Sequence, residues 1–298
     1  MRRIGIDFGG TKLEAAVLDG DGAFLTRIRT PNPGDYDRAI ADLRGLVDAV
    51  EAEVGPCASV GVGVPGSVSP RTGTMRNANA VFLNGRRFAE DLERALGRPV
   101  RVANDANCMA LSEAVDGAAA GAKVAFGVIV GTGVGGGLVV DGHIVEGANG
   151  LGGEWGHLPL PWMTADEFPG APCWCGQRGC LDLLISGTGL RRDHAARTGT
   201  EMDGTAIVAA ARAGDADAGA SLAACIDRLG RALAMVVNTV DPDVFVLGGG
   251  LSNVAELYPP LPDIIRAHAF GGEWEGQVVP ARWGDSSGVR GAARLWAD

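Results

Sequence analysis

The sequence predicts an α/β protein built from two similar domains around a shared cleft. Its 298 residues are about twice the length of a typical domain. Apolar segments with strand-like patterns alternate with segments whose apolar residues recur at helical spacing. A strand, a glycine-rich turn and a second strand occur in residues 3–18 and again in residues 124–140. This repeat favours an internal duplication, with a ligand held between the two copies.

The first copy places a carboxylate beside a turn. Residues 3–8 and 13–18 read as strands, and the turn between them is Gly9-Gly10-Thr11-Lys12. A second strand follows these glycines, whereas P-loop and Rossmann motifs continue into a helix. An ordinary hairpin is the alternative. Asp7 at the strand end favours a phosphate site, because a carboxylate can hold a metal-bound water beside the N–H groups of such a turn.

The next segments complete the first predicted domain, which we place at residues 1–115. Residues 35–54 have the pattern of an amphipathic helix, and residues 58–64 form a buried strand ending at Pro65-Gly66-Ser67. A polar loop covers residues 76–80, and Phe88, Leu92 and Leu96 mark a short helix.

Asn104 and Asp105 stand where a short β-branched strand ends and a helical pattern over residues 106–115 begins. Asn and Asp at that position commonly satisfy the free N–H groups of the first helical turn. A carboxylate at such a junction can also act as a general base. The local pattern is compatible with both roles.

The second predicted domain covers residues 116–287. The strand at 124–130 leads into Gly131-Thr132-Gly133-Val134-Gly135-Gly136-Gly137, and residues 138–140 return as a strand. We expect helices at residues 205–212 and 216–240, and a strand at 244–247 whose glycine-rich end opens into a helix. A terminal helix at 288–298 is expected to pack back on the first domain.

Charge and composition exclude several classes of protein. Lys and Arg number 26 against 36 Asp and Glu, which gives a net charge of −10 and argues against a nucleic-acid partner. No apolar run has the length of a membrane span or a signal peptide, so we expect a cytoplasmic protein with no membrane partner.

Three of the six cysteines are clustered near a histidine. His157, Cys173, Cys175 and Cys180 supply the donor set of a closed tetrahedral zinc site, which would be structural. A redox Cys-x-Cys pair with an unrelated histidine is the alternative. Cys57, Cys108 and Cys225 stand in apolar surroundings and are expected to be buried.

These motifs, taken in order along nearly the whole chain, resemble those of the ROK family of bacterial sugar kinases. The matching segments are Asp7 to Lys12, Gly63-Val64-Pro65-Gly66, Asn104-Asp105-Ala106-Asn107, Gly131 to Gly137, Gly153-Glu154-Trp155-Gly156-His157, the cysteine motif at 173–180, and Asp241-Pro242-Asp243 with Gly248-Gly249-Gly250. Within the family, bacterial fructokinases of the manno(fructo)kinase type are the most similar, through Asn77-Ala78-Asn79 and the runs at 155–163 and 284–293.

The resemblance implies an actin-like (ribonuclease H-like) fold of two α/β domains that close over ATP, Mg²⁺ and a hexose. It implies that Asp105 is the general base for the sugar 6-hydroxyl. The substrate-binding residues it implies are Gly66, Asn79, Asn104, Glu154, His157 and Asp182. The residues it implies for ATP and Mg²⁺ are Asp7, Gly9, Gly10, Thr11, Lys12, Gly131, Thr132, Gly133, Gly249 and Gly250. Structural zinc and a homodimer are further expectations from the family.

Asp182 departs from the family pattern, in which a sugar-contacting Glu usually follows Cys-Leu or Cys-Ile. The carboxylate of Asp182 reaches about 1.5 Å less far than that of a glutamate, so this residue leaves open which hexose is preferred. We expect fructose, or mannose, with glucose or N-acetylglucosamine as the alternative. A sugar-binding regulator without kinase activity and a noncatalytic assembly protein are the competing classes. A noncatalytic assembly protein needs neither the Asn104-Asp105 pair nor the zinc motif, so both features argue against that class.

Overall fold

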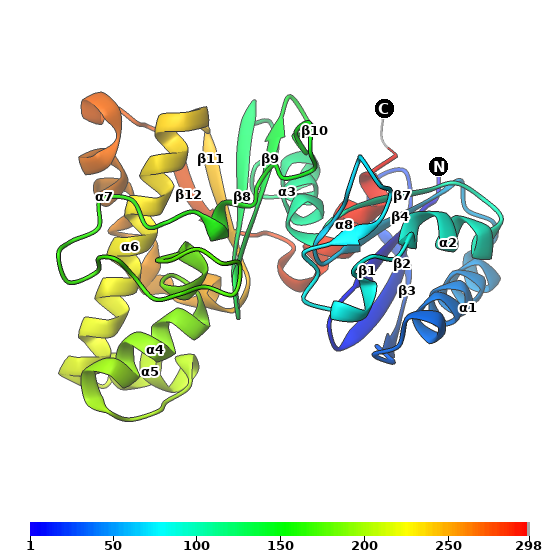
Figure 1. Ribbon diagram of the computed structural model, residues 1–298. Coiled ribbons are helices and arrows are strands. Elements are labelled where there is room, and N and C mark those ends of the chain that lie inside the picture. The colour runs from blue at the N-terminus through cyan, green and yellow to red at the C-terminus, as the bar shows by residue number, and fades with distance from the viewer. Residues whose placement is uncertain (297–298) are drawn as a thin grey trace. The chain divides into compact units, whose positions relative to one another are not determined.

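The computed structural model describes residues 1–296, which divide into two compact α/β units (Figure 1). Unit 1 contains Met1–Gly121, Gly137–Gly153 and the C-terminal segment from Asp285, and unit 2 contains Ala122–Gly136 and Glu154–Gly284. Residues 137–153, which we had assigned to the second domain, therefore group with the first. Close packing explains this difference, because a Cβ on Gly137 would lie 2.7 Å from the carbonyl oxygen of Ala106.

Unit 1 is built on a mixed five-stranded sheet in the order β3-β2-β1-β4-β7. Its strands are β1 (Arg3–Phe8), β2 (Lys12–Leu18), β3 (Phe24–Pro31), β4 (Ser59–Val64) and β7 (Val100–Asn104). The first three are antiparallel neighbours, whereas β1, β4 and β7 are parallel. The carboxyl ends of β1, β4 and β7 therefore lie at one edge of the sheet, where Asp7 and Asn104 are found.

The alternation of side chains along β1 assigns its two faces. Ile4, Ile6 and Phe8 are buried in one core with apolar residues of α1 (Tyr36–Val54) and α2 (Phe88–Leu96). Gly5 lies on the opposite face, where a Cβ would be 1.9 Å from the carbonyl oxygen of Val289. Only glycine lets the backbone around Val289 come this close to β1. The alternation of large apolar residues and glycine along β1 therefore determines which helices can cover each face.

The opposite face of the unit 1 sheet carries α3 (Asp105–Asp116) and α8 (Ser287–Arg294), which pack closely on each other. Gly291 makes this possible, since a Cβ there would meet the carbonyl oxygen of Cys108 at 1.7 Å. The buried hydroxyl of Ser287 donates a hydrogen bond of 2.7 Å to Oε1 of Glu113. The short strands of this unit are β5 (Ser67–Val68), β6 (Met75–Arg76) and β10 (His143–Ile144).

Unit 2 repeats the strand order of unit 1. The second sheet has the order β10-β9-β8-β11-β12, which is again third, second, first, fourth and fifth along the chain. Strand β10 and the end of β9 that pairs with it group with unit 1, and the other strands belong to unit 2. The strands are β8 (Val124–Val130), β9 (Val134–Val140), β11 (Val244–Gly248) and β12 (Gln277–Pro280). The two glycine turns thus join the first and second strands of two sheets with the same strand order, as the predicted duplication requires.

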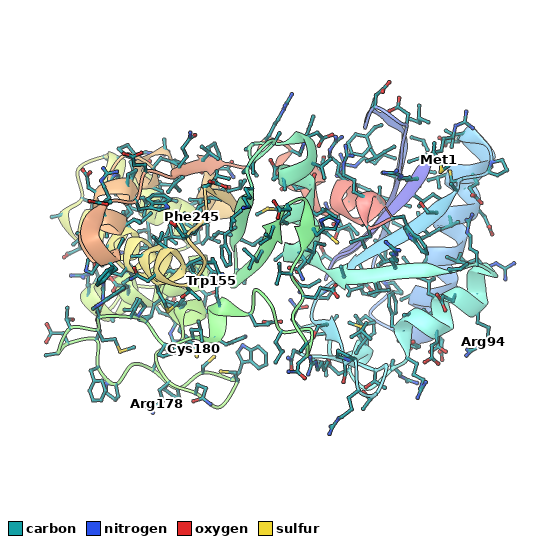
Figure 2. The ribbon with its side chains drawn as sticks, turned by 90° about the horizontal axis from the view of Figure 1, so that it is seen from above. Met1, Arg94, Trp155, Arg178, Cys180 and Phe245 are labelled. Carbon is teal, nitrogen blue, oxygen red and sulfur yellow. The ribbon has the colours of Figure 1, made fainter. Side chains whose placement is uncertain are left out.

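Aromatic residues form the centre of unit 2. The ring of Phe126 on β8 makes edge contacts with Trp155 and Phe245, at centroid distances of 5.5 Å and 6.0 Å. Trp155 and Phe245 are labelled in Figure 2. The long helix α6 contacts α4, α5 and α7. The helices are α4 (Gly187–Thr198), α5 (Gly204–Arg212), α6 (Ala216–Val240) and α7 (Leu261–His268).

Some elements differ from the sequence expectations. The glycine-rich end of β11 leads into the 3₁₀ turns Gly250–Asn253 and Ala255–Leu257, and a regular helix begins only at Leu261. The terminal helix ends at Arg294, and residues 297–298 of the expected helix lie outside the described residues. Strands β3 and β12 were not expected. Within residues 1–296, no helix is long and apolar enough to cross a membrane.

Candidate active site

The candidate site residues fall into two groups, one in each unit. Unit 1 contains Asp7, the turn at 9–12, Gly66, Asn79, Asn104 and Asp105. Unit 2 contains the turn at 131–133, Glu154, the cysteine cluster, Asp182, Gly249 and Gly250.

The turn between β1 and β2 is closed by a hydrogen bond of 2.9 Å from the amide of Gly9 to the carbonyl of Lys12. Asn32 holds it from the other side, because its Nδ2 donates to the carbonyl of Gly9 at 2.7 Å and its amide donates to Thr11 at 2.9 Å. Both bonds occupy carbonyl groups of the turn. Amide groups of such a turn can bind an anion, as predicted for phosphate.

Asp7 lies on β1, and Asp105 directly follows β7. The carboxyl ends of both strands lie at the same edge of the unit 1 sheet. Burial raises the pKa of Asp7 from 3.8 to about 6, and the charges of Asp105 and Glu14 add to the rise. The backbone of Gly288 at the beginning of α8 also lies close to Asp7, since a Cβ there would be 3.6 Å from Oδ1. Two neighbouring carboxylates that repel each other form a site suited to a divalent cation.

Replacing Asp7 with asparagine is expected to stabilise the ligand-free protein at pH 8 by about 1–3 kcal/mol. The native state binds the Asp7 proton more tightly than the unfolded chain, because the pKa is raised to about 6. Stability attributable to Asp7 is therefore present below about pH 4 and is lost as the pH rises to about 6. Urea unfolding of both proteins from pH 4 to pH 8 measures this difference, and a variant less stable than wild type at pH 8 would contradict it.

The junction at Asn104 and Asp105 has the geometry of a capped helix. The side chain of Asn104 accepts a hydrogen bond of 2.9 Å from the amide of Ala106, and its Nδ2 donates to the carbonyl of Gly66 at 3.0 Å. Oδ1 of Asp105 also accepts from Ala106, at 2.8 Å. The capping role is thus confirmed for Asn104, and the cap fixes Asp105 as the first residue of α3.

Gly66 and the loop that carries Asn79 are held together within unit 1. Gly66 has a φ of 77°, and a Cβ there would lie 2.4 Å from the carbonyl oxygen of Arg76. Asn84 fixes the loop, because its side-chain amide makes hydrogen bonds of 2.9 Å to both the amide and the carbonyl of Ala78. Asn79 itself is exposed next to this anchor. The structure thus brings the Gly66, Asn79 and Asn104 segments to one region.

In unit 2, the turn between β8 and β9 contacts the start of the glycine-rich segment after β11. The amide of Gly131 donates a hydrogen bond of 2.9 Å to the carbonyl of Gly133. Gly249 has a φ of 82°, and a Cβ there would lie 2.9 Å from the amide nitrogen of Gly131. These two glycine segments, both predicted to contact nucleotide, therefore lie side by side.

Asp182 lies against the same turn. Its Oδ1 accepts a hydrogen bond of 2.8 Å from the amide of Val134. A Cβ on Gly133 would be 2.7 Å from that oxygen. The carboxylate that the resemblance assigns to the sugar thus has a backbone partner in the predicted phosphate turn.

The zinc motif forms a compact group of four donors. One ligand atom from each of His157, Cys173, Cys175 and Cys180 lies within 4.8 Å of the others. Sγ of Cys175 is 3.6 Å from Sγ of Cys180, and Sγ of Cys173 is 3.8 Å from Nδ1 of His157. These separations suit a tetrahedral site with Zn–S bonds of about 2.3 Å and Zn–N bonds of about 2.0 Å. Glu154 immediately precedes the 3₁₀ turn Trp155–His157, whose last residue is one of these four donors.

Glu14 is a buried residue that the sequence analysis missed. Its side chain is 1% exposed and accepts hydrogen bonds from Nε of Arg27 and from Nε of Arg29, the latter at 2.5 Å. Nζ of Lys12 lies 3.8 Å from its Oε2. The signal was a glutamate within the apolar strand 13–18, alongside two arginines in the next segment.

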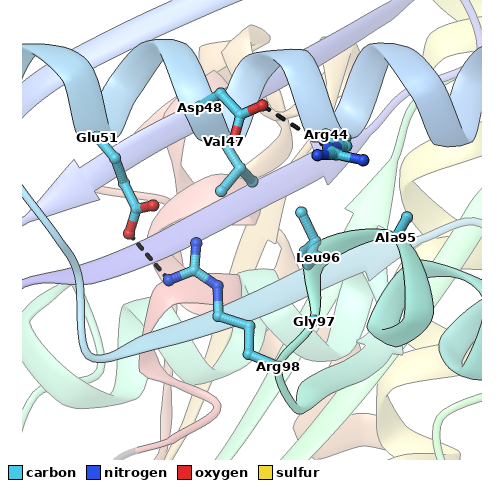
Figure 3. A pocket seen from close by; sticks show the side chains of 8 residues that line it. All are labelled: Arg44, Val47, Asp48, Glu51, Ala95, Leu96, Gly97 and Arg98. Carbon is cyan, nitrogen blue, oxygen red and sulfur yellow. Dashed lines mark hydrogen bonds and ion pairs between the residues drawn. The ribbon is translucent and has the colours of Figure 1, made fainter.

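A cavity of about 260 Å³ in unit 1 is lined by residues of α1 and of the segment 95–98, none of which is a candidate site residue (Figure 3). Its charged lining groups largely pair with each other, since Arg98 donates to Glu51 at 2.9 Å and Arg44 lies 3.8 Å from Asp48. Burial opposes ionisation of Glu51, but the hydrogen bonds from Arg98 and from the amide of Cys57, together with the charge of Arg98, outweigh it and lower the pKa of that carboxyl group.

Comparison with known proteins decides the family. The ROK family profile matches residues 3–298. The chain belongs to the ROK family. It is 41% identical over 294 residues to N-acetylgalactosamine kinase AgaK of Shewanella sp. (strain ANA-3), covering 98% of this chain and 95% of that protein.

Two further relatives extend the comparison. N-acetyl-D-glucosamine kinase of Yersinia pseudotuberculosis is 40% identical over 296 residues, covering 98% of this chain and 97% of that protein. The ROK family glucokinase of Streptomyces griseus, solved with glucose and AMPPNP, superposes with a TM-score of 0.81 at 30% identity and covers 99% of both chains. The predicted fold is confirmed: this ROK protein has the actin-like ATPase fold of two α/β domains.

Proposed function

We propose that this ROK protein transfers the γ-phosphoryl group of ATP to the 6-hydroxyl of a hexose or N-acetylhexosamine. The observation that carries the proposal is the position of Asp105, at the first residue of a capped helix and close enough to Asp7 for their charges to interact. Phosphoryl transfer needs positioned phosphates, a cation and a base for the attacking hydroxyl. Asp105 is proposed as that base, and Asp7 as the residue that holds Mg²⁺ through water.

The nucleotide would contact the backbone of both glycine turns and the segment at Gly249 and Gly250. Thr11, Lys12 and Thr132 are the polar residues of these turns. Bound Mg²⁺ supplies charge neutralisation on the phosphates. Asn104, Glu154 and His157 are proposed to hold sugar hydroxyls, together with the backbone at Gly66 and the side chain of Asn79.

N-acetylglucosamine is proposed as the first candidate substrate, because the relatives at 40% and 41% identity are named as N-acetylhexosamine kinases. This ranking replaces fructose, which the sequence resemblance placed first. Fructose stays the second candidate, favoured by the residue runs at 155–163 and 284–293 and by the loop at Asn77 to Asn79.

A coupled ADP-release assay tests both the activity and the ranking. The sugars are N-acetylglucosamine, N-acetylgalactosamine, N-acetylmannosamine, glucose, mannose and fructose, each with Mg·ATP. We expect N-acetylglucosamine to have a kcat/KM at least about tenfold above that of fructose. The reverse ranking would establish the second candidate. A protein that binds one of these sugars but releases no ADP with any of them would be a regulator, which contradicts the proposal.

His157, Cys173, Cys175 and Cys180 are proposed to bind one structural zinc ion, since four protein donors leave no position for water. Removing the metal with a chelator is expected to lower the thermal unfolding midpoint by roughly 10 °C or more, because structural zinc contributes directly to folding. Cys180→Ser should reproduce this loss, whereas Cys57→Ser, at a buried cysteine outside the cluster, should keep the metal. Freshly purified protein that contains no metal, and whose thermal unfolding midpoint does not change when a chelator is added, would contradict the site.

The homodimer that the family resemblance implies is also proposed. The molar mass of the purified protein by light scattering tests it, and a mass near 30.5 kDa would show a monomer instead.

A further inference from the structure

The turn from Gly131 to Val134 is held by a short segment that follows Cys180. Gly187 donates its amide to the carbonyl of Gly131, and Thr188 donates its hydroxyl to the carbonyl of Thr132, each at 2.8 Å. Asp182 accepts from the amide of Val134, also at 2.8 Å. We call Asp182, Gly187 and Thr188 the turn clamp.

Ser186 makes the turn clamp a single unit. Its hydroxyl donates to the carbonyl of Asp182 at 2.6 Å and accepts from the amide of Gly189 at 2.9 Å, which caps α4. The backbone of Asp182 is therefore bonded to the first turn of the helix that carries Gly187 and Thr188. Ser186 is fully buried, so water does not compete for these bonds.

The clamp determines the direction of two amide groups in the turn. A trans peptide is planar, so its C=O and N–H bonds point in opposite directions. Because α4 binds the carbonyl of Gly131, the amide of Thr132 points away from α4. The carbonyl of Thr132 is bound in the same way, so the amide of Gly133 also points away. A glycine-rich turn would otherwise sample many conformations. Because the turn is fixed, the amides of Thr132 and Gly133 are already oriented as donors before an anion binds.

We infer that Asp182 and Thr188 are positioning residues that hold the Gly131–Val134 turn in its phosphate-binding arrangement. This inference rests on the proposed function and deepens it, because it separates Asp182 from the sugar and assigns it to the nucleotide. The methylene that Asp182 lacks relative to glutamate is consistent with this role, since its Oδ1 is already 2.8 Å from the amide of Val134.

The test compares two pairs of variants. Thr188→Val removes the donated hydrogen bond and keeps the side-chain shape, whereas Thr188→Ser keeps the hydroxyl. Asp182→Ala removes the acceptor, whereas Asp182→Asn keeps an oxygen for the amide of Val134. Steady-state kinetics give KM separately for Mg·ATP and for the sugar, and calorimetry gives the affinity for Mg·ADP without sugar.

We expect Thr188→Val and Asp182→Ala each to raise KM for Mg·ATP and Kd for Mg·ADP about three- to tenfold, as for the loss of one hydrogen bond. KM for the sugar should stay within about twofold. Thr188→Ser and Asp182→Asn should both stay within about twofold of wild type for all three values. If the residue only supports the fold, its replacement would instead lower the unfolding midpoint and change KM for Mg·ATP and KM for the sugar alike.

Two results would overturn the inference. One is an Asp182→Ala variant whose KM rises for the sugar alone, which would return Asp182 to sugar binding. The other is a Thr188→Val variant with unchanged nucleotide affinity. If Asp182→Ala does not fold, the Thr188 pair decides the question. Wild-type protein that releases no ADP with any sugar would contradict the proposed function and the inference together, whereas an active wild type with either result above overturns the inference alone.

Discussion

Replacing Asp105 with asparagine is expected to lower kcat about a thousandfold, within the range found for loss of a positioned general base. Asparagine keeps the size of the side chain and an oxygen for the amide of Ala106, which now lies 2.8 Å from Asp105. The beginning of α3 should therefore stay folded, and affinities for sugar and Mg·ATP should change by less than about threefold. Steady-state kinetics and calorimetry on the purified variant measure both effects.

Asp116→Asn is the matched control, because Asp116 is the last residue of the same helix and pairs with Arg290 at 2.7 Å. This variant should keep kcat within about twofold of wild type. Near-normal turnover of Asp105→Asn would exclude Asp105 as the base. A large loss of sugar affinity, with kcat retained, would make Asp105 a binding residue instead.

Replacing Glu167 with alanine is expected to lower the free energy of unfolding by about 3 kcal/mol, as for breaking a buried ion pair from one side. Glu167 is 10% exposed and accepts hydrogen bonds of 2.8 Å and 2.9 Å from Arg231, which is 5% exposed. Nε of Arg228 donates to the same carboxylate at 2.9 Å. The change leaves both guanidinium groups largely buried without this partner. Urea unfolding at pH 7 measures the loss.

The pH dependence of this loss identifies its cause. Burial alone would raise the pKa of Glu167, but hydrogen bonds from Arg231 and Arg228 outweigh it and hold the pKa at about 2. The folded pKa lies below the unfolded value, so the stability from Glu167 is fully present above about pH 4.5. It is lost as the pH falls towards 2, where wild type and variant should converge.

The exposed pair between Arg212 and Glu256 provides the control, because Glu256→Ala should have little effect on unfolding. An effect of Glu167→Ala no larger than that of the control would show that the buried network does not stabilise unit 2. A difference that persists unchanged at pH 2 would show that its stability does not come from the ionised carboxylate.

Local patterns predicted the parts of the fold that depend on neighbouring residues. The alternation in β1 and β2 and the helical spacing after Asp105 gave the correct elements, because side-chain periodicity reflects the face that is buried. The Asn104 cap followed from the preference of the free N–H groups for a short polar side chain. The repeated strand and glycine turn indicated two similar domains, and the two sheets have the same strand order.

The missed features depend on residues far apart in the sequence. Strand β3, which was not expected, carries Arg27 and Arg29, and both bind the buried Glu14 of the neighbouring strand. Asp182 lies 48 residues from Val134, so no local pattern could connect its carboxylate to that amide. The helix expected after β11 begins only at Leu261, because the segment after Gly249 first forms 3₁₀ turns.

The central claim is that this ROK protein phosphorylates a sugar on oxygen 6 with ATP as donor. Phosphorus NMR of the wild-type protein with Mg·ATP and N-acetylglucosamine, and with each other sugar of the panel, tests it most directly. We expect ADP and a sugar 6-phosphate to appear together in equal amounts, and neither to appear at a comparable rate with Asp105→Asn. ATP that remains unchanged with every sugar, or phosphate attached to a different hydroxyl, would contradict the claim.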